Sequence, residues 1–226
     1  MFRKFILAAL VVTSAAFAQV GVGVRAASNV GTLYGDDVKN TSWNVGFNAG
    51  VAVKFDVLPI ISIISGLEVD LRRIPEKYKR VEEYDGKDLG LEDVGVFSID
   101  WDVEEDLTMW YLDIPVFARF NFIPMFHFDF GAYFAFNLSS NIHYKQVASY
   151  GVSSASESGD VDISKEVKTF DAGLLAGAGV SILPGMLDID FRLTLGFAGV
   201  DLAGKNDEAV WVNHLRMQLG ATFWFM

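Results

Sequence analysis

The chain has no cysteine, little charge, and no long apolar run beyond its first residues. Without cysteine, disulfide scaffolds, thiolate zinc sites and cysteine nucleophiles are excluded. After residue 18 there is no stretch of 18 consecutive apolar residues, so no transmembrane helix is expected there. Charged residues make up 21% of the sequence, and the formal net charge of −11 argues against a nucleic-acid partner.

Apolar and aromatic residues are abundant. Hydrophobic residues make up 51% of the 226 residues and aromatic residues 14%, and 19 residues are Phe. Intrinsic disorder, which requires few aromatics and much charge, is excluded for most of the chain. Such a chain is either a soluble β-protein or a protein that crosses lipid with strands.

Residues 1–18 have the form of an export signal. Arg3 and Lys4 precede an apolar stretch from residue 5 to residue 12, and residues 16–18 read Ala-Phe-Ala, a small-x-small cleavage motif. The alternative is an N-terminal membrane anchor, but the apolar stretch is short for a span of about 20 residues. We expect cleavage after Ala18, and residues 19–226 to form one domain.

Apolar and polar residues alternate with a period of two, which is typical of strands with two unlike faces. In residues 125–138, six of the apolar residues are Phe or Leu at even positions, while His127 and Asp129 share the opposite face with Tyr133. A helix, with 3.6 residues per turn, would mix the two sets. The pattern predicts eight strands, within residues 20–27, 43–57, 61–72, 110–122, 125–138, 169–182, 187–197 and 211–225.

Short and long connections alternate between these segments. Three are tight and contain proline, at residues 58–60, 123–125 and 183–185. Four are longer and polar, near residues 28–42, 73–108, 140–168 and 199–210. We therefore predict an all-β, eight-stranded antiparallel up-and-down transmembrane barrel, with short periplasmic turns and long extracellular loops. The expected location is the bacterial outer membrane.

The apolar face should contact lipid, with the polar face inside. Seven bulky side chains from one strand, repeated around eight strands, would overfill a lumen only just wide enough for side chains. The polar face is rich in small residues and carries charges of both signs, which must be paired when buried. We expect a structural salt-bridge network that fills the lumen, formed by Arg25, Lys54, Asp56, Glu68, Asp70, Arg72, Asp113, Arg119, Asp129, Asp171, Asp188, Asp190, Arg192 and Arg216.

The C-terminal run 218–225 resembles the terminal-strand signal of outer-membrane barrels, which reads polar-x-Gly-x-x-aromatic-x-aromatic. Gln218, Gly220, Phe223 and Phe225 occupy its positions, and one further residue, Met226, follows the terminal aromatic. The resemblance implies two partners, the barrel-assembly machinery during insertion and outer-membrane lipid afterwards.

A second resemblance covers most of the mature chain. Residues 111–115 read Tyr-Leu-Asp-Ile-Pro and lead to Arg119-Phe120; residues 130–133 and the glycine-rich residues 171–179 follow. Together these elements resemble the PorT-like outer-membrane β-barrel family. The resemblance implies a barrel and little about activity.

Candidate chemistry is sparse. His143 lies close in sequence to Ser139 and Ser140, and an acyltransferase or protease at the outer rim would need such groups. Residues 75–106 carry twelve acids and four bases, so this loop is a candidate site for an extracellular ligand or divalent cations, although a solvated loop explains it as well. We expect no catalytic residue, bound metal or cofactor.

The sequence thus predicts a monomeric outer-membrane barrel with a filled lumen, acting as a structural or adhesion protein through its extracellular loops. One alternative is a narrow pore or carrier for small solutes. Another is a rim-located acyltransferase or protease that uses His143.

Overall fold

The structure, a computed structural model, describes residues 20–35, 43–85, 96–123, 125–150, 153–165, 167–197 and 212–225. The expected export signal lies outside these residues. The described chain is all strand and turn, and none of it forms a helix long and apolar enough to cross a membrane. Its nine strands are β1 (Val20–Gly35), β2 (Asn44–Leu58), β3 (Ile61–Asp85), β4 (Val96–Ile123), β5 (Phe126–Tyr150), β6 (Ser153–Asp162), β7 (Phe170–Leu183), β8 (Leu187–Gly196) and β9 (Val212–Phe225).

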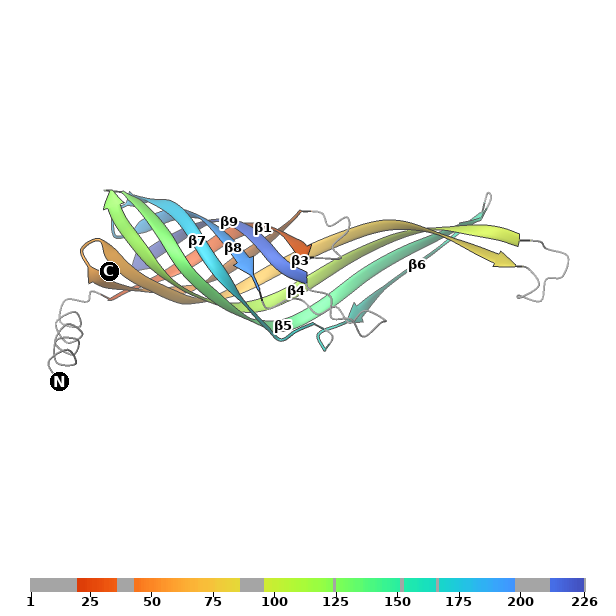
Figure 1. Ribbon diagram of the computed structural model, residues 1–226, viewed down its shortest axis with the longest axis horizontal. Helices are drawn as coiled ribbons and strands as arrows, with labels where there is room; N and C mark the ends of the chain where they lie inside the picture. The colour runs from red at the N-terminus through yellow and green to blue at the C-terminus, as the bar shows by residue number, and fades with distance from the viewer. Residues whose placement is uncertain are drawn as a thin grey trace.

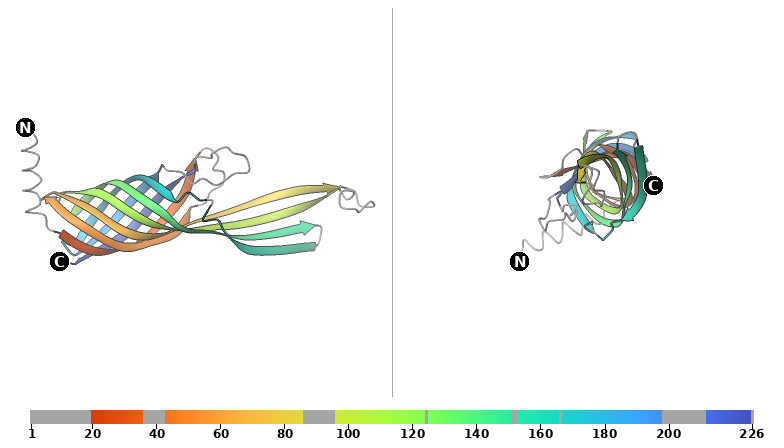
Figure 2. Two further views of the ribbon diagram at one scale, coloured as in Figure 1. Left: turned by 90° about the horizontal axis from the view of Figure 1, so that it is seen from below. Right: turned by 90° about the vertical axis from the view of Figure 1, so that its right-hand side faces the viewer.

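Eight strands close into a ring, which confirms the predicted barrel (Figure 1; Figure 2, right). The sheet order is β4-β3-β2-β1-β9-β8-β7-β5-β6, and a further pairing of β4 with β5 closes it. Each described pairing is antiparallel. Strand β6 is not part of the ring. It pairs with residues 141–150 of β5, whereas β7 pairs with residues 126–136 of the same strand. A closed ring leaves no unpaired edge at the level of the membrane.

The two faces of the ring follow the alternation in the sequence. In β5, Phe126, Phe128 and Phe130 are exposed on the outside, whereas His127 and Asp129 between them are buried inside. Because phenylalanine is stable outside the ring only if lipid covers it, the outer face is the membrane-facing side of the barrel.

The tight turns at one end are built around residues with unusual backbone angles. Gly185, in the turn between β7 and β8, has a φ of 77°, and Met125, before β5, has a φ of 70°. The left-handed region costs glycine nothing but is uncommon for methionine. Residues 59–60 make the third tight turn, between β2 and β3.

At the other end, segments expected to be loops are strands. Residues 73–85 continue β3, residues 96–108 begin β4, and residues 139–150 continue β5, with β6 beside them. These strands form a sheet with the order β3, β4, β5, β6 that projects beyond the ring (Figure 1; Figure 2, left). We call this sheet the extension. The predicted long connections lie here, and much of their length is strand. Consecutive charges such as Lys79-Arg80 and Glu104-Glu105 break the apolar alternation by which the other strands were predicted.

The segment between β6 and β7 closes the mouth of the barrel. Ile163 and Val167 are 5% and 3% exposed, and they pack in one apolar cluster with Tyr111, Tyr133 and Leu107. The Ile163 N–H donates to the Ser140 carbonyl oxygen, which fixes this segment to β5. An apolar layer therefore separates the lumen from the base of the extension.

Candidate functional site

Most of the charges expected in the lumen lie there. Twelve of the fourteen residues are buried inside the ring. The exceptions are Lys54 and Asp56, which form a half-buried pair, with 3.8 Å between Nζ and Oδ2, near the turn end of β2. The twelve buried residues form three layers along the barrel.

The layer nearest the mouth is centred on Arg72 of β3. Its guanidinium reaches the carboxylates of Asp70, Asp113 and Asp171 at 2.8, 2.9 and 3.0 Å. Arg216 of β9 pairs with Asp70 and also with Asp113, the latter at 3.0 Å. The same arginines lie over aromatic rings, with 3.8 Å from Arg72 to the Tyr111 centroid. Arginine is suited to such a position, since its planar group pairs with several carboxylates and stacks on rings.

The middle layer joins opposite sides of the ring. Arg25 of β1 lies 3.3 Å from Glu68 and 2.8 Å from Asp190. Arg192 lies 3.5 Å from Glu68 and 2.9 Å from Asp190, so the two arginines share two carboxylates. Arg192 also lies 4.6 Å from the ring centroid of Phe117. This layer spans the lumen from β1 and β3 to β8.

The third layer lies toward the tight turns. Arg119 donates to both oxygens of Asp129 at 2.8 Å, a bidentate pair, and to Asp188 at 2.6 Å. Two neutral donors, Trp224 Nε1 at 2.8 Å and Ser181 Oγ at 2.6 Å, complete the shell of Asp188. Ion pairs and hydrogen bonds thus connect the walls of the lumen in all three layers.

Neutral donors balance an excess of carboxylates. The described lumen holds five arginines and seven carboxylates. Asn29 donates to Asp70 at 2.7 Å, Asn48 to Glu68 at 3.0 Å and the Tyr133 hydroxyl to Asp171 at 2.9 Å. Buried carboxylates need such donors, because desolvation of an ion costs several kcal/mol unless its lone pairs are satisfied.

Most of these neutral donors were not predicted from the sequence to be members of the network. Asn48 and Tyr133 fall on the polar faces of their strands, and their positions alone indicated that they point inward. Trp224 is 3% exposed and also points inward, between Phe223 and Phe225, which face outward. The alternation of the strand places Trp224 on the inner face. Its residue type suggests the opposite, because tryptophan in a membrane strand is usually expected to face lipid.

The three histidines lie apart. His127 and His214 are buried in the lumen, 1% and 3% exposed. His143 lies on the outer surface of the extension, where its Nδ1 is 2.9 Å from Asp160 Oδ1. The described contacts of the nearby serines go elsewhere: Ser139 accepts from Asn141 and Ser140 accepts from Asn137. The arrangement does not assemble a nucleophile with its base.

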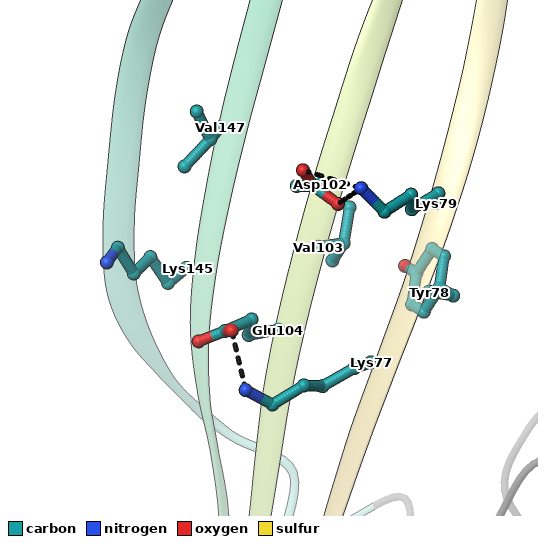
Figure 3. Close-up of a pocket in the computed structure, with 8 residues that line it drawn as sticks. All are labelled: Lys77, Tyr78, Lys79, Asp102, Val103, Glu104, Lys145 and Val147. Carbon is teal, nitrogen blue, oxygen red and sulfur yellow. Dashed lines mark hydrogen bonds and ion pairs between the residues drawn. The ribbon is translucent and has the colours of Figure 1, made fainter.

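One face of the extension carries columns of opposite charge on neighbouring strands. Figure 3 shows Lys77 reaching Glu104 at 2.6 Å and Lys79 reaching Asp102 at 3.0 Å, from β3 to β4. Lys145 of β5 lies on the other side of Glu104 in the same hollow of about 440 Å³. The hydrogen bond from Lys77 and the nearby charges of Lys77 and Lys145 lower the pKa of Glu104. Cross-strand pairs of this kind hold strands in register.

The other face of the extension has an unfavourable pair. Glu76 of β3 lies directly opposite Glu105 of β4. Partial burial and the charge of Glu105 raise the pKa of Glu76. The Tyr78 hydroxyl donates to Glu105 at 3.2 Å and relieves part of this repulsion.

The acids of residues 75–106 do not converge on one point in the described part of that segment. They are spread along the two strands, and no group of three or more His, Asp or Glu residues among the described residues is arranged to hold a metal ion. Residues 86–95, with the acids at 88, 92 and 93, lie outside the described residues.

The residues of the expected insertion signal divide between the two faces of the C-terminal strand β9. Phe223 and Phe225 are exposed on the lipid-facing side, while Gln218 is buried in the lumen. Gly220 lies where a Cβ would fall 2.6 Å from the Arg25 guanidinium and 2.8 Å from the Ala27 Cβ, so a larger residue would have to displace one of them. Met226 lies outside the described residues.

Solved structures with a similar chain course are barrels of the outer membrane. Ail of Yersinia pestis, crystallised with the heparin analogue sucrose octasulfate, matches with a TM-score of 0.39 at 14% identity, over 92% of this chain and 99% of its own. Neisserial surface protein A matches with 0.38 at 12% identity, over 92% and 99%. The outer-membrane protease OmpT of Escherichia coli matches with 0.33 at 10% identity, over 92% and 96%.

A search of curated proteins found no match. The family model described as "Outer membrane protein beta-barrel domain" matches residues 17–201, which is most of the sequence. The chain belongs to this family, and it is a small bacterial outer-membrane β-barrel with a buried, salt-bridged interior.

Proposed function

We propose that the protein is a closed membrane anchor that holds a rigid β-sheet outside the cell as a binding or adhesion surface. The observation that carries this proposal is the continuation of β3, β4 and β5 beyond the barrel without interruption. The thirteen residues 73–85 alone extend about 40 Å at roughly 3.3 Å per residue. A sheet continuous with its anchor presents its surface at a fixed distance from the membrane.

Charge supports an extracellular binding role. The described strands of the extension, residues 73–85, 96–108, 141–150 and 153–162, carry twelve acids and five bases. Such a field favours cationic ligands and cationic surfaces and speeds their encounter with the sheet. We propose that the acidic segment 75–106 contributes to this surface, as part of a sheet rather than as a loop.

The rival function as a pore conflicts with the packing of the lumen. Three layers of ion pairs cross it, and Ile163 and Val167 cover its mouth. An eight-stranded barrel has room for little besides its own side chains. We propose that no solute pathway exists in this state, and that the protein is not an enzyme, since His143 pairs with Asp160 alone among the described residues.

We also propose a PorT-like ancestry for this chain. The Tyr-Leu-Asp-Ile-Pro element at residues 111–115 supports PorT-like ancestry within the family. Insertion by the barrel-assembly machinery, removal of residues 1–18, and a barrel that needs no second subunit in the membrane belong to the same proposal. Contact with outer-membrane lipid follows from the exposed apolar belt.

Two measurements test the proposal. In planar bilayers the purified protein should give no steady conductance, and sustained single-channel currents would establish the pore instead. Cells producing the intact protein should adhere to amine-coated surfaces more than cells producing a variant in which Asn-Gly replaces residues 78–104. Equal adhesion, with equal amounts of folded protein in the membrane, would remove the binding role of the β3–β4 part of the extension.

A further inference from the structure

The extension has two open edges. Strand β3 loses its pairing with β2 after Leu71, and β6 pairs only with β5 among the described strands. Pro75 lacks an N–H, so the uninterrupted edge of β3 begins at residue 76. Each edge presents backbone N–H and C=O groups to which another strand can be added.

The two edges differ in charge where they would overlap. Along residues 73–82, β3 carries four bases and two acids (Arg73, Lys77, Lys79 and Arg80; Glu76 and Glu82), and its two further acids, Glu83 and Asp85, lie nearer the tip. Strand β6 carries Glu157, and nearer the mouth two aspartates, and no base. Like charges directly opposite one another destabilise a strand pair, and opposite charges stabilise it. The acidic β6 edge therefore repels a copy of itself and is attracted by the basic residues of the β3 edge.

Strand direction selects the same combination. Strand β3 runs from a tight turn toward the tip of the extension, and β6 runs from the tip back to the mouth (Figure 1). Barrels inserted in one membrane share one orientation. A β6 strand beside the β3 strand of an adjacent copy is then antiparallel, like each described pairing, whereas β3 beside β3 or β6 beside β6 would be parallel. Parallel pairs are slightly less stable per residue.

We propose that adjacent copies of this protein join outside the membrane, the β6 edge of one extension adding as a strand to the β3 edge of the next. The inference uses the outward orientation of the extension given under the proposed function and does not require an extracellular ligand. Because each copy keeps one free edge of each kind, the contact is head-to-tail and builds rows rather than closed dimers.

The pairing of residues across the four strands of one copy predicts the register of the contact between copies. Lys79, Asp102, Val147 and Ser156 lie side by side across the four strands. Continuing such rows into the adjacent copy places Ser154 opposite the neighbour's Val81. It also places Glu157 diagonal to the neighbour's Arg80 and to the neighbour's Glu76, both within reach of a long side chain.

The absence of native cysteine allows a direct cross-linking test. Val81 is 62% exposed and Ser154 is also exposed, and both face the charged side of the sheet. The double variant Val81→Cys with Ser154→Cys is treated with a short bis-maleimide in intact outer membranes. The controls are each single variant alone, and Val81→Cys with Ser153→Cys, whose second thiol lies on the opposite face of β6.

The double variant should yield a ladder of cross-linked species, and co-produced single variants should yield a dimer. Each single variant alone should stay monomeric, and the Ser153→Cys control should give much less product. Three results would overturn the inference: only monomer although both thiols are labelled in intact cells, equal cross-linking in the single variants, or products that contain a different protein. Labelling from outside confirms the orientation separately, so a failed contact is distinguishable from a failed proposed function.

A charge variant gives an independent readout. With Glu76→Gln in the double-cysteine background, Glu157→Lys should lower the yield of cross-linked species several-fold, because the new cation then lies near the neighbour's Arg80 with no acid diagonal to it. High salt should lower the yield from the parent double-cysteine variant, because screening weakens exposed charge pairs. An unchanged yield under both conditions would contradict pairing between oppositely charged edges.

Discussion

At the residue scale, the buried arginines should contribute far more to the free energy of unfolding than the exposed lysines. Arg72 holds three carboxylates inside the barrel, and for Asp171 it is the one described salt-bridge partner. Arg72→Ala should destabilise the barrel by about 3–5 kcal/mol, because the remaining buried charges lose their partner. Lys79→Ala, at a pair whose side chains are 82% and 57% exposed, should cost about 0–1 kcal/mol. Urea titration of the folded band in lipid vesicles measures both, and similar losses would mean that the lumen is wet.

The outward side chains lead to a second prediction. Leu193 of β8 lies on the lipid-facing side. Leu193→Arg should cost about 2–4 kcal/mol near the middle of the bilayer and lower the folding yield. The matched control is Val81→Arg, at an exposed position of the extension beyond the membrane. If both variants fold like the parent, the apolar belt is not in lipid.

The pair of Glu76 and Glu105 predicts a local pH dependence. Burial and the charge of Glu105 raise the pKa of Glu76 in the folded state, so protonation of Glu76 stabilises the extension. This stability is fully present below the pKa of the unfolded state and is lost as pH rises through the folded pKa. Hydrogen exchange of residues 73–85, corrected for intrinsic rates, should show protection falling as the pH rises above the ordinary pKa of a glutamate. Glu76→Gln should reduce that fall, and an identical profile would remove Glu76 as its source.

The sequence predicted which residues face inward, but not how they are connected. A period of two assigned Arg119 and Asp129 to the same face of adjacent strands, and they form a bidentate pair. The sharing of Glu68 and Asp190 between Arg25 and Arg192 depends on the stagger of strands around the ring, which no local pattern encodes. Lys54 and Asp56 have the same periodicity as the others, yet they form a half-buried pair near the turn end of β2.

At the element scale, strands were predictable where lipid dictates the pattern and not where it does not. Strand β6 reads Ser-Ser-Ala-Ser-Glu-Ser-Gly-Asp-Val-Asp and has little apolar alternation. It is a strand because ten of its residues pair with β5, a context that outweighs weak intrinsic preference. Ile163 and Val167, which close the mouth, sit in a short connection with no periodic signal at all.

The extension should be dispensable for the barrel. When Asn-Gly replaces residues 78–104, the pairs from Ile61 with Phe120 to Glu76 with Glu105 remain, and a short hairpin turn joins them. We expect the truncated protein to fold and insert with parental stability toward urea. The comparison uses the folded band of both proteins, and loss of that band would show that the outer strands are part of the folding core.

At the scale of the whole molecule, the closure of the strand ring and the ion pairs that fill its lumen stabilise the same structure. The ring removes strand edges within the membrane, and the ion layers join opposite walls of the same ring, as Arg25 does between β3 and β8. Unfolding must therefore break hydrogen bonds and ion pairs in one cooperative step. The extension, which has open edges and mostly exposed ion pairs, is free of this constraint and should be the first part to lose protection from exchange.

This cooperativity predicts the behaviour of the protein in a detergent gel. An unboiled outer-membrane sample should migrate as a compact species distinct from the boiled chain, since detergent alone does not open a closed ring with a bridged interior. Arg72→Ala should lower the temperature at which the compact band disappears, whereas Lys79→Ala should leave it unchanged. A soluble periplasmic protein with no heat-dependent shift would require apolar side chains inside and charges outside. The bidentate pair of Arg119 with Asp129, buried on the inner face of two adjacent strands, would then have no place to form.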